Sequence, residues 1–263
     1  MYIAAFILLL VIIIFILFYI GPFTFRRVRP GDNYKVGDKL HSIPGIEIKQ
    51  LHVYFLKHQV LSDMRQLLED LHIIFTENNI PYWITCGTLL GCSRHNGFIP
   101  WDDDIDINVE LKYRDRLFDL LSEQDNMNYV LYPARGGYKF GFRNFSRFPF
   151  VDIIIVNENN SIFQLCYPLD ENGNCTYEVG KQWPNECFPV SDVYPLKKKN
   201  FEDFEVFVPK NYEILLHRIY GEDCLTAAGT QDNAPYAYSL KSIPWLMNHY
   251  YDNILFRLGL HKG

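Results

Sequence analysis

The segment of this sequence best suited to chemistry is a run of acidic residues followed by aliphatic ones. It reads Trp-Asp-Asp-Asp-Ile-Asp-Ile-Asn from 101 to 108. Because side chains two apart on a strand point to the same face, Asp104 and Asp106 are predicted to project together while Ile105 and Ile107 pack behind them. Two carboxylates so close repel each other unless a cation lies between them, and their oxygens suit Mg²⁺ or Mn²⁺. The spacing therefore predicts a metal site.

A third acidic residue, Asp152, stands in the run 150–156, Phe-Val-Asp-Ile-Ile-Ile-Val, which is otherwise suited to burial. Burying an unpaired carboxylate is costly, so Asp152 is expected to meet a partner on a neighbouring strand. With two metal ions about 3.5 to 4 Å apart, one can activate an attacking hydroxyl and the other can neutralise a leaving phosphate oxygen. The three acids therefore favour phosphoryl transfer.

Other interpretations of the acidic run compete with this one. A solvated turn would tolerate three successive aspartates, but it leaves Asp152 unexplained. A calcium-binding loop fails because Ile107 stands where that loop requires glycine and Tyr113 where it requires glutamate. A glycosyltransferase of the Asp-x-Asp type, using Mn²⁺ with a nucleotide diphosphate, stays open, although its motif does not require a glycine turn upstream.

The elements that must position these acids are expected to form an α/β chain with a mixed sheet. Helices are expected at 50–78, 112–124 and 212–220, and strands at 82–85, 104–109, 129–132, 139–143, 150–156 and 204–208. Between the first of these strands and another helix, Cys86-Gly87-Thr88 is predicted to turn sharply at its glycine. A strand, a glycine turn and a helix in this order can bind phosphate.

The first twenty residues carry no charged side chain and suit a single transmembrane helix about 30 Å long. We expect 1–21 to be this membrane anchor, 22–49 a stem rich in proline and glycine, and 50–263 one catalytic domain. The net charge of −6 is spread along the chain, so we expect no nucleic acid among its partners.

The stretch 82–107, Tyr-Trp-Ile-Thr-Cys-Gly-Thr-Leu-Leu-Gly-Cys-Ser-Arg-His-Asn-Gly-Phe-Ile-Pro-Trp-Asp-Asp-Asp-Ile-Asp-Ile, resembles the signature of the LicD/fukutin family, which includes bacterial phosphocholine transferases. Segments between 188 and 221 are similar to the end of the same domain. The resemblance implies the polymerase-β-like nucleotidyltransferase fold. It also implies transfer of a phosphorylated alcohol from a CDP-activated donor, such as CDP-choline or CDP-ribitol, to a glycan or glycoconjugate. A catalytically silent binding partner in a glycan-modifying complex is a further alternative, which the intact acids disfavour.

The resemblance also implies roles for individual residues. Gly87 and Thr88 would hold the donor phosphates, while Asp104, Asp106 and Asp152 would hold Mg²⁺ or Mn²⁺. Four more residues are candidates for the site, namely Asp102, Arg94, Lys139 and Arg143.

Each of these four residues has two possible roles. Asp102 would act as a base or orient a metal ligand. Arg94 would neutralise donor phosphate, or would be a surface cation. Lys139 and Arg143 would meet phosphate or acceptor, or would only keep an edge strand soluble. Cysteines 86 and 92 are expected to pack in the core.

The orientation of the anchor has opposing signals. Three arginines between 26 and 29 predict a cytosolic domain. Three glycosylation sequons, at Asn144, Asn159 and Asn174, and six cysteines that could pair favour an oxidising lumen. On family grounds the Golgi or ER lumen is slightly favoured, and the cytosolic side stays open.

Overall fold

The computed structural model describes residues 23–27, 33–36, 39–42, 47–48, 54–56, 58–99, 102, 104–124, 129–134, 136–143, 149–171 and 173–228. The predicted anchor at 1–21 and the sequon at Asn144 lie outside the described residues. Within the described part of the chain, no helix combines the length and the apolar character that crossing a membrane requires.

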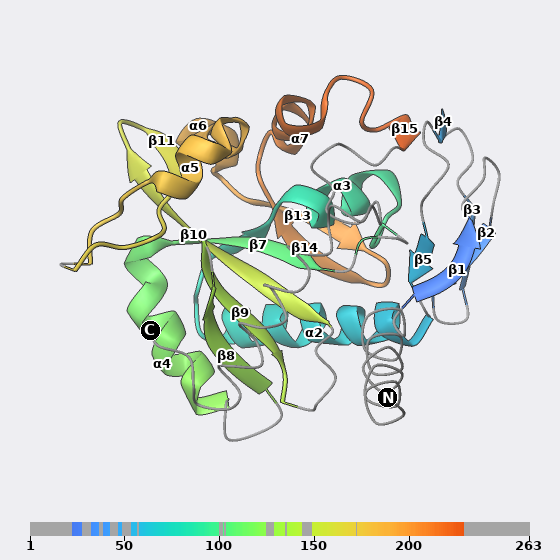
Figure 1. The fold of residues 1–263 in the computed structure, drawn as a ribbon, viewed down its shortest axis with the longest axis horizontal. Helices are drawn as coiled ribbons and strands as arrows, with labels where there is room; N and C mark the ends of the chain where they lie inside the picture. Colours follow the sequence, from blue (N-terminus) through green and yellow to red (C-terminus); the bar gives the residue numbers. More distant parts are fainter. Residues whose placement is uncertain are drawn as a thin grey trace, which may run out of the picture.

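A seven-stranded mixed sheet forms the centre of the protein (Figure 1). Five strands follow one another across it in the order β12 (Phe188–Pro189), β11 (Ile162–Leu165), β10 (Phe150–Asn159), β7 (Ile105–Glu110) and β6 (Tyr82–Ile84). Next to β10 lies β9 (Gly137–Phe142), which also pairs with β8 (Tyr129–Ala134). The pair β7 and β10 is parallel, and the other described pairs of this sheet are antiparallel. The predicted α/β class with a mixed sheet is confirmed.

Alternation along the strands divides the core into two clusters on opposite faces of the sheet. On one face Ile107 of β7 packs in the same cluster as Leu71 of α2 (His58–Glu77). On the other face Trp83 and Val156 pack with residues of α5 (Glu178–Gln182), α6 (Val190–Val193) and α7 (Tyr212–Tyr220). Figure 1 shows α2 on one side of the sheet and these three short helices on the other. The acidic residues share the second face.

The remaining elements join these layers. The helix α3 (Cys86–Arg94) follows β6, and α4 (Arg114–Gln124) follows the 3₁₀ turn η2 (Leu111–Tyr113). A second 3₁₀ turn, η3 (Pro184–Glu186), precedes β12, and β13 (Lys197–Phe201) forms an antiparallel hairpin with β14 (Phe204–Val208). The strand expected at 204–208 and the helix expected at 212–220 have the predicted bounds.

The first predicted helix is wrong at its start. It begins at His58, and β5 (Tyr54–Leu56) precedes it as a strand that pairs with β1 (Phe23–Arg27). Apolar residues of a short strand can imitate helical spacing, and the pairing with β1 decides between them. The segment predicted as a stem also contains β2 (Asn33–Val36), β3 (Lys39–Ser42) and β4 (Glu47–Ile48), which pairs with β15 (Ala227–Ala228).

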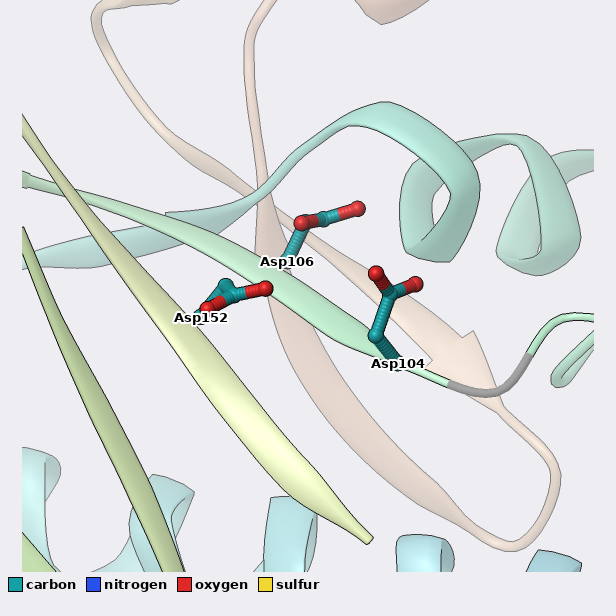
Figure 2. Close-up of side chains that lie close together, drawn as sticks. All are labelled: Asp104, Asp106 and Asp152. Atoms are coloured by element: carbon teal, nitrogen blue, oxygen red, sulfur yellow. The ribbon is translucent and has the colours of Figure 1, made fainter. Parts of the chain in front are cut away.

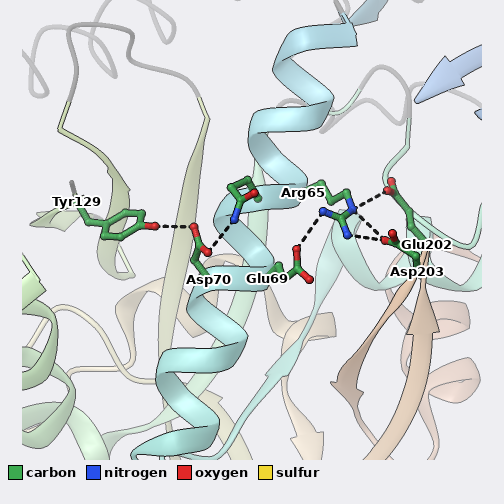
Figure 3. A network of polar contacts seen from close by, with 7 residues as sticks. Arg65, Glu69, Asp70, Tyr129, Glu202 and Asp203 are labelled. Atoms are coloured by element: carbon green, nitrogen blue, oxygen red, sulfur yellow. Dashed lines mark hydrogen bonds and ion pairs between the residues drawn. The ribbon is translucent and has the colours of Figure 1, made fainter. Parts of the chain in front are cut away.

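One arginine ties α2 to the β13–β14 hairpin (Figure 3). Arg65 donates from Nε and Nη2 to Asp203 Oδ1, at 2.9 and 2.6 Å, and from Nη1 to Glu69 Oε2 at 3.0 Å. Its Nε also lies 3.6 Å from Glu202 Oε2. On the other side of the helix, Asp70 accepts a hydrogen bond from Tyr129 of β8. These contacts fix α2 against elements on both sides.

We predict that Arg65→Met lowers the free energy of unfolding by about 1 to 2 kcal/mol, because three carboxylates lose a shared, partly buried cation. Denaturant titration of the full chain, followed by circular dichroism, measures the change. Lys198→Met is the matched control, because its ion pair with Glu205 is 58% and 52% exposed and is expected to contribute less than about 0.5 kcal/mol. Equal losses in the two variants would show that the Arg65 network contributes no more to stability than an exposed ion pair does.

Candidate functional site

Three carboxylates meet on adjacent parallel strands, as the sequence pattern predicted. Asp152 of β10 lies in register with Asp106 of β7, and Asp104 immediately precedes β7. One ligand oxygen from each of the three lies within 4.8 Å of the others. Figure 2 shows the three side chains gathered at the same end of the two strands. The structure therefore brings the predicted metal ligands together, and their role stays a prediction.

The electrostatics of this acid triad, Asp104, Asp106 and Asp152, suit a divalent cation. Burial raises the pKa of Asp106 well above its usual value, and the charges of Asp104 and Asp152 raise it further. The donors are all carboxylate oxygens, the ligand type that Mg²⁺ and Mn²⁺ prefer. Ligand oxygens around Mg²⁺ lie about 3 to 4 Å apart, which a small contraction of the triad would provide. The residues present therefore fit such an ion.

In the turn before α3, the residue with the left-handed backbone conformation is not the glycine that the sequence predicts. The positive φ of 45° belongs to Cys86, whereas Gly87 is not among the residues with positive φ. Gly87 instead leaves space for Asp102, because a Cβ at this position would lie 2.1 Å from Oδ2 of Asp102 and would displace that carboxylate. The Asp102 carboxylate thus lies directly against the first turn of α3.

Thr88, predicted to bind phosphate, is buried and contacts the acid strand. Its Oγ1 accepts a hydrogen bond of 2.8 Å from the backbone N–H of Asp106. This contact ties the start of α3 to the strand that carries the metal ligands. The side chain therefore positions Asp106, and contact with a donor phosphate stays a prediction.

Lys139 is placed inside the site. It lies in register with Asp152 on β9, and its Nζ is 2.6 and 2.8 Å from the two carboxylate oxygens of that residue. The lysine is only 7% exposed, and β9 has neighbouring strands on both sides. The edge-strand interpretation of Lys139 is therefore wrong. Arg143 lies one residue past the end of β9 and is exposed.

Arg94, the last residue of α3, is partly buried, which contradicts its interpretation as a surface cation. Its Nη1 donates to the carbonyl oxygen of Cys224 at 2.9 Å, and its Nε donates to Nδ1 of His95 at 3.4 Å. The guanidinium thus ties α3 to the segment after α7. Phosphate binding by Arg94 stays a prediction.

Two residues beside the triad were missed by the sequence reasoning. Burial raises the pKa of Glu186 in η3 to about 7, although a hydrogen bond with Cys86 opposes the shift. Burial also raises the pKa of Tyr220, at the end of α7, and the charges of Asp102 and Asp106 add to this effect. Tyr220 falls within a segment that resembles the family, so a signal for it existed. The sequence around Glu186 offers no such signal, because η3, which brings Glu186 to the site, lies far along the chain from the acidic run.

The cysteines divide into one disulfide and four thiols. Cys166 and Cys175 are bonded, while Cys86, Cys92, Cys187 and Cys224 are free. Cys92 is buried in the main core, as predicted, whereas Cys86 is partly exposed beside the site. Two of the predicted sequon asparagines, Asn159 and Asn174, are exposed.

Comparison with known proteins matches this region to one family. The model described as "LicD/FKTN/FKRP, nucleotidyltransferase domain" matches residues 79–211. An uncharacterized protein of Rickettsia prowazekii is 30% identical over 174 residues, which is 66% of this chain and 60% of that protein. The Lipopolysaccharide cholinephosphotransferase LicD of Haemophilus influenzae is 36% identical over 68 residues, 26% of each chain.

A mammalian relative matches as well. The Ribitol 5-phosphate transferase FKRP of Mus musculus is 27% identical over 149 residues, 54% of this chain and 28% of that protein. The matches thus span less than two thirds of each of these relatives. Among solved structures, a lincosamide antibiotic adenylyltransferase, LnuA, aligns with a TM-score of 0.35 and 16% identity over 55% of this chain and 78% of its own.

The matched residues contain the strand, turn and helix from β6 to α3, all three acids and Lys139. The expected resemblance is therefore confirmed by a match to half of the chain. This protein belongs to the LicD/FKTN/FKRP family, through its nucleotidyltransferase domain.

Proposed function

We propose that this chain transfers a phosphorylated alcohol, such as phosphocholine or ribitol phosphate, from a CDP-activated donor to a glycan hydroxyl. The catalytic domain would have the polymerase-β-like form of the nucleotidyltransferase fold. The observation that carries the proposal is the acid triad beside the first turn of α3. The names of two relatives, a cholinephosphotransferase and a ribitol 5-phosphate transferase, support the class of group that is transferred.

In this proposal the acid triad holds Mg²⁺ or Mn²⁺, which when bound would neutralise charge on the donor diphosphate. The Asp102 carboxylate lies against the first turn of α3 at Gly87, and backbone N–H groups at the start of a helix can bind phosphate. The acceptor hydroxyl attacks the phosphorus that carries the alcohol, the bond to the CMP oxygen breaks, and CMP leaves with the bonding electron pair. The proton of the hydroxyl passes to a carboxylate.

Two carboxylates are candidates for that base. Asp102 is one candidate, because it lies against the first turn of α3 and its charge acts on Asp106. Glu186 is a second candidate, because a pKa of about 7 suits a group that accepts a proton near neutral pH.

We also propose that residues 1–21 anchor the chain in a membrane of the Golgi or ER, with the catalytic domain in the lumen. The disulfide between Cys166 and Cys175 supports an oxidising compartment. Exposed Asn159 and Asn174 lie in acceptor sequons and are available for glycosylation.

The donor is predicted to be cleaved between its two phosphates. CDP-choline or CDP-ribitol, incubated with the full chain, Mg²⁺ and a glycan acceptor mixture, should release CMP, and the acceptor should gain the alcohol with its phosphate. Chromatography of the nucleotides and mass spectrometry of the acceptor give the two readings. A UDP-sugar that releases a nucleoside diphosphate and leaves a bare sugar would instead establish the glycosyltransferase alternative. Binding of donor without turnover by any acceptor would favour a silent family member.

Asp106→Asn should separate stability from metal binding. In EDTA at pH 7 the variant has a neutral amide in place of a carboxyl group whose ionisation burial, Asp104 and Asp152 all oppose, so it should melt no lower than the wild type. The pKa of Asp106 is higher in the folded protein than in the unfolded chain, where it is about 4. The wild type therefore loses stability as the pH rises from the unfolded-state pKa through the folded-state pKa. The variant lacks this loss, so its relative advantage should grow from acid to neutral pH.

Bound metal and nucleotide should reverse the order of the two melting temperatures, so that the wild type melts above Asp106→Asn. Mg²⁺ with CDP-choline at a hundredfold excess over Kd should stabilise the wild type by about 2.7 kcal/mol and the variant far less, with transferase activity lost. Thermal melts with and without ligand measure both effects. Asp115→Asn, at a side chain that is 89% exposed on α4, is the control and should respond as the wild type does. An equal ligand-induced shift in Asp106→Asn would exclude Asp106 as a ligand.

The orientation of the anchor is predicted to place Asn159 and Asn174 in the lumen. Protein made in eukaryotic membranes should lose mass on glycosidase treatment, and an Asn174→Gln variant should lose one glycan. Protease digestion of intact microsomes tests the opposite orientation. Cleavage of the catalytic domain from the cytosolic side, with no glycan attached, would overturn the lumenal assignment.

A further inference from the structure

Lys139 is a cation built into the acid triad. Its Nζ contacts both oxygens of Asp152, at 2.6 and 2.8 Å, and lies 3.4 Å from the ring centroid of Phe150. The residue is 7% exposed, and buried lysines are rare unless they are paired. An ammonium held by a carboxylate and an aromatic face is fixed in place, because both contacts would be lost if it moved into water.

The register of three strands produces this arrangement. Asp152 of β10 pairs with Asp106 on its β7 side and with Lys139 on its β9 side. Cross-strand partners share a face of the sheet, so the charges run across it as negative, negative and positive. Asp152 is thus shared between the acid pair and the lysine.

We propose that Lys139 is a placeholder cation of the metal centre. It holds Asp152 in its ligand position while no metal is bound, and it weakens the binding of a free divalent ion. The metal would then enter with the donor diphosphate, which supplies further oxygen ligands and negative charge. The inference rests on the proposed metal-dependent function and adds an order of binding to it.

The physical argument predicts two effects of opposite sign. Without metal, Lys139 offsets repulsion among Asp104, Asp106 and Asp152, so its removal should destabilise the protein. With metal, the ammonium and the divalent ion repel each other across Asp152, so its removal should tighten metal binding. An ion pair that served only the fold would give the first effect without the second.

The experiment compares the full chain with Lys139→Met, Lys139→Gln and Lys139→Arg. Mn²⁺ binding is measured by calorimetry and electron paramagnetic resonance, with Mn²⁺ alone and with Mn²⁺ plus CDP, and melting is measured in EDTA. Lys139→Gln keeps a hydrogen-bond donor without the charge, so it tests the charge even where Lys139→Met fails to fold. Lys139→Arg keeps the charge.

Both uncharged variants should bind Mn²⁺ alone at least tenfold more tightly than the wild type, and Lys139→Met should melt several degrees lower in EDTA. The gain in Mn²⁺ affinity that CDP causes should shrink by a similar factor in both. Lys139→Arg should stay within about threefold of the wild type. Equal Mn²⁺ affinity in the wild type and both uncharged variants would overturn the placeholder role and leave the metal site standing. Absence of Mn²⁺ binding in every protein, with or without CDP, would overturn both the placeholder role and the metal site.

Discussion

The parallel pairing of β7 with β10 forces three carboxylates together against their mutual repulsion, and the surrounding structure depends on that pairing. A slip of one residue in β10 would turn Asp152 into the core and an isoleucine out of it. The opposite face prevents such a slip, because Ile107 of β7 and Ile153 of β10 are register partners buried in the main cluster. Apolar packing on one face thus enforces electrostatic strain on the other.

Several contacts limit the cost of this strain. The ammonium of Lys139 neutralises part of the charge at Asp152, and the backbone of Asp106 is held by Thr88. Asp102 and Glu186 add negative charge nearby, since both raise the pKa of Asp106. A fold that gathers this much like charge in a half-buried place is less stable there than it could be. Such local costs are typical of sites that bind cations or perform chemistry.

The sequence predicts those features that depend on local periodicity. Alternation along the strand was sufficient to pair Asp104 with Asp106, and the apolar run around Asp152 was sufficient to place that residue on a buried strand. The position of Lys139 was not predictable in the same way, because its burial depends on β9 lying between β8 and β10. The turn before α3 depends on two residues, not on its glycine alone. Cys86 takes the positive φ, while Gly87 makes room for Asp102, and spacing alone does not distinguish these tasks.

The site also extends past the part of the chain that the family model matches. That match ends at residue 211, yet Tyr220 of α7 is close enough to Asp106 for the charge of this carboxylate to raise the pKa of the tyrosine further, beyond the effect of burial. Arg94, at the end of α3, reaches further and donates to the carbonyl of Cys224. Because α3 also carries Thr88, which accepts from the backbone N–H of Asp106, this one helix links the acid strand to the segment around Cys224. The structural unit that supports the acid triad therefore includes α7 and continues to Cys224.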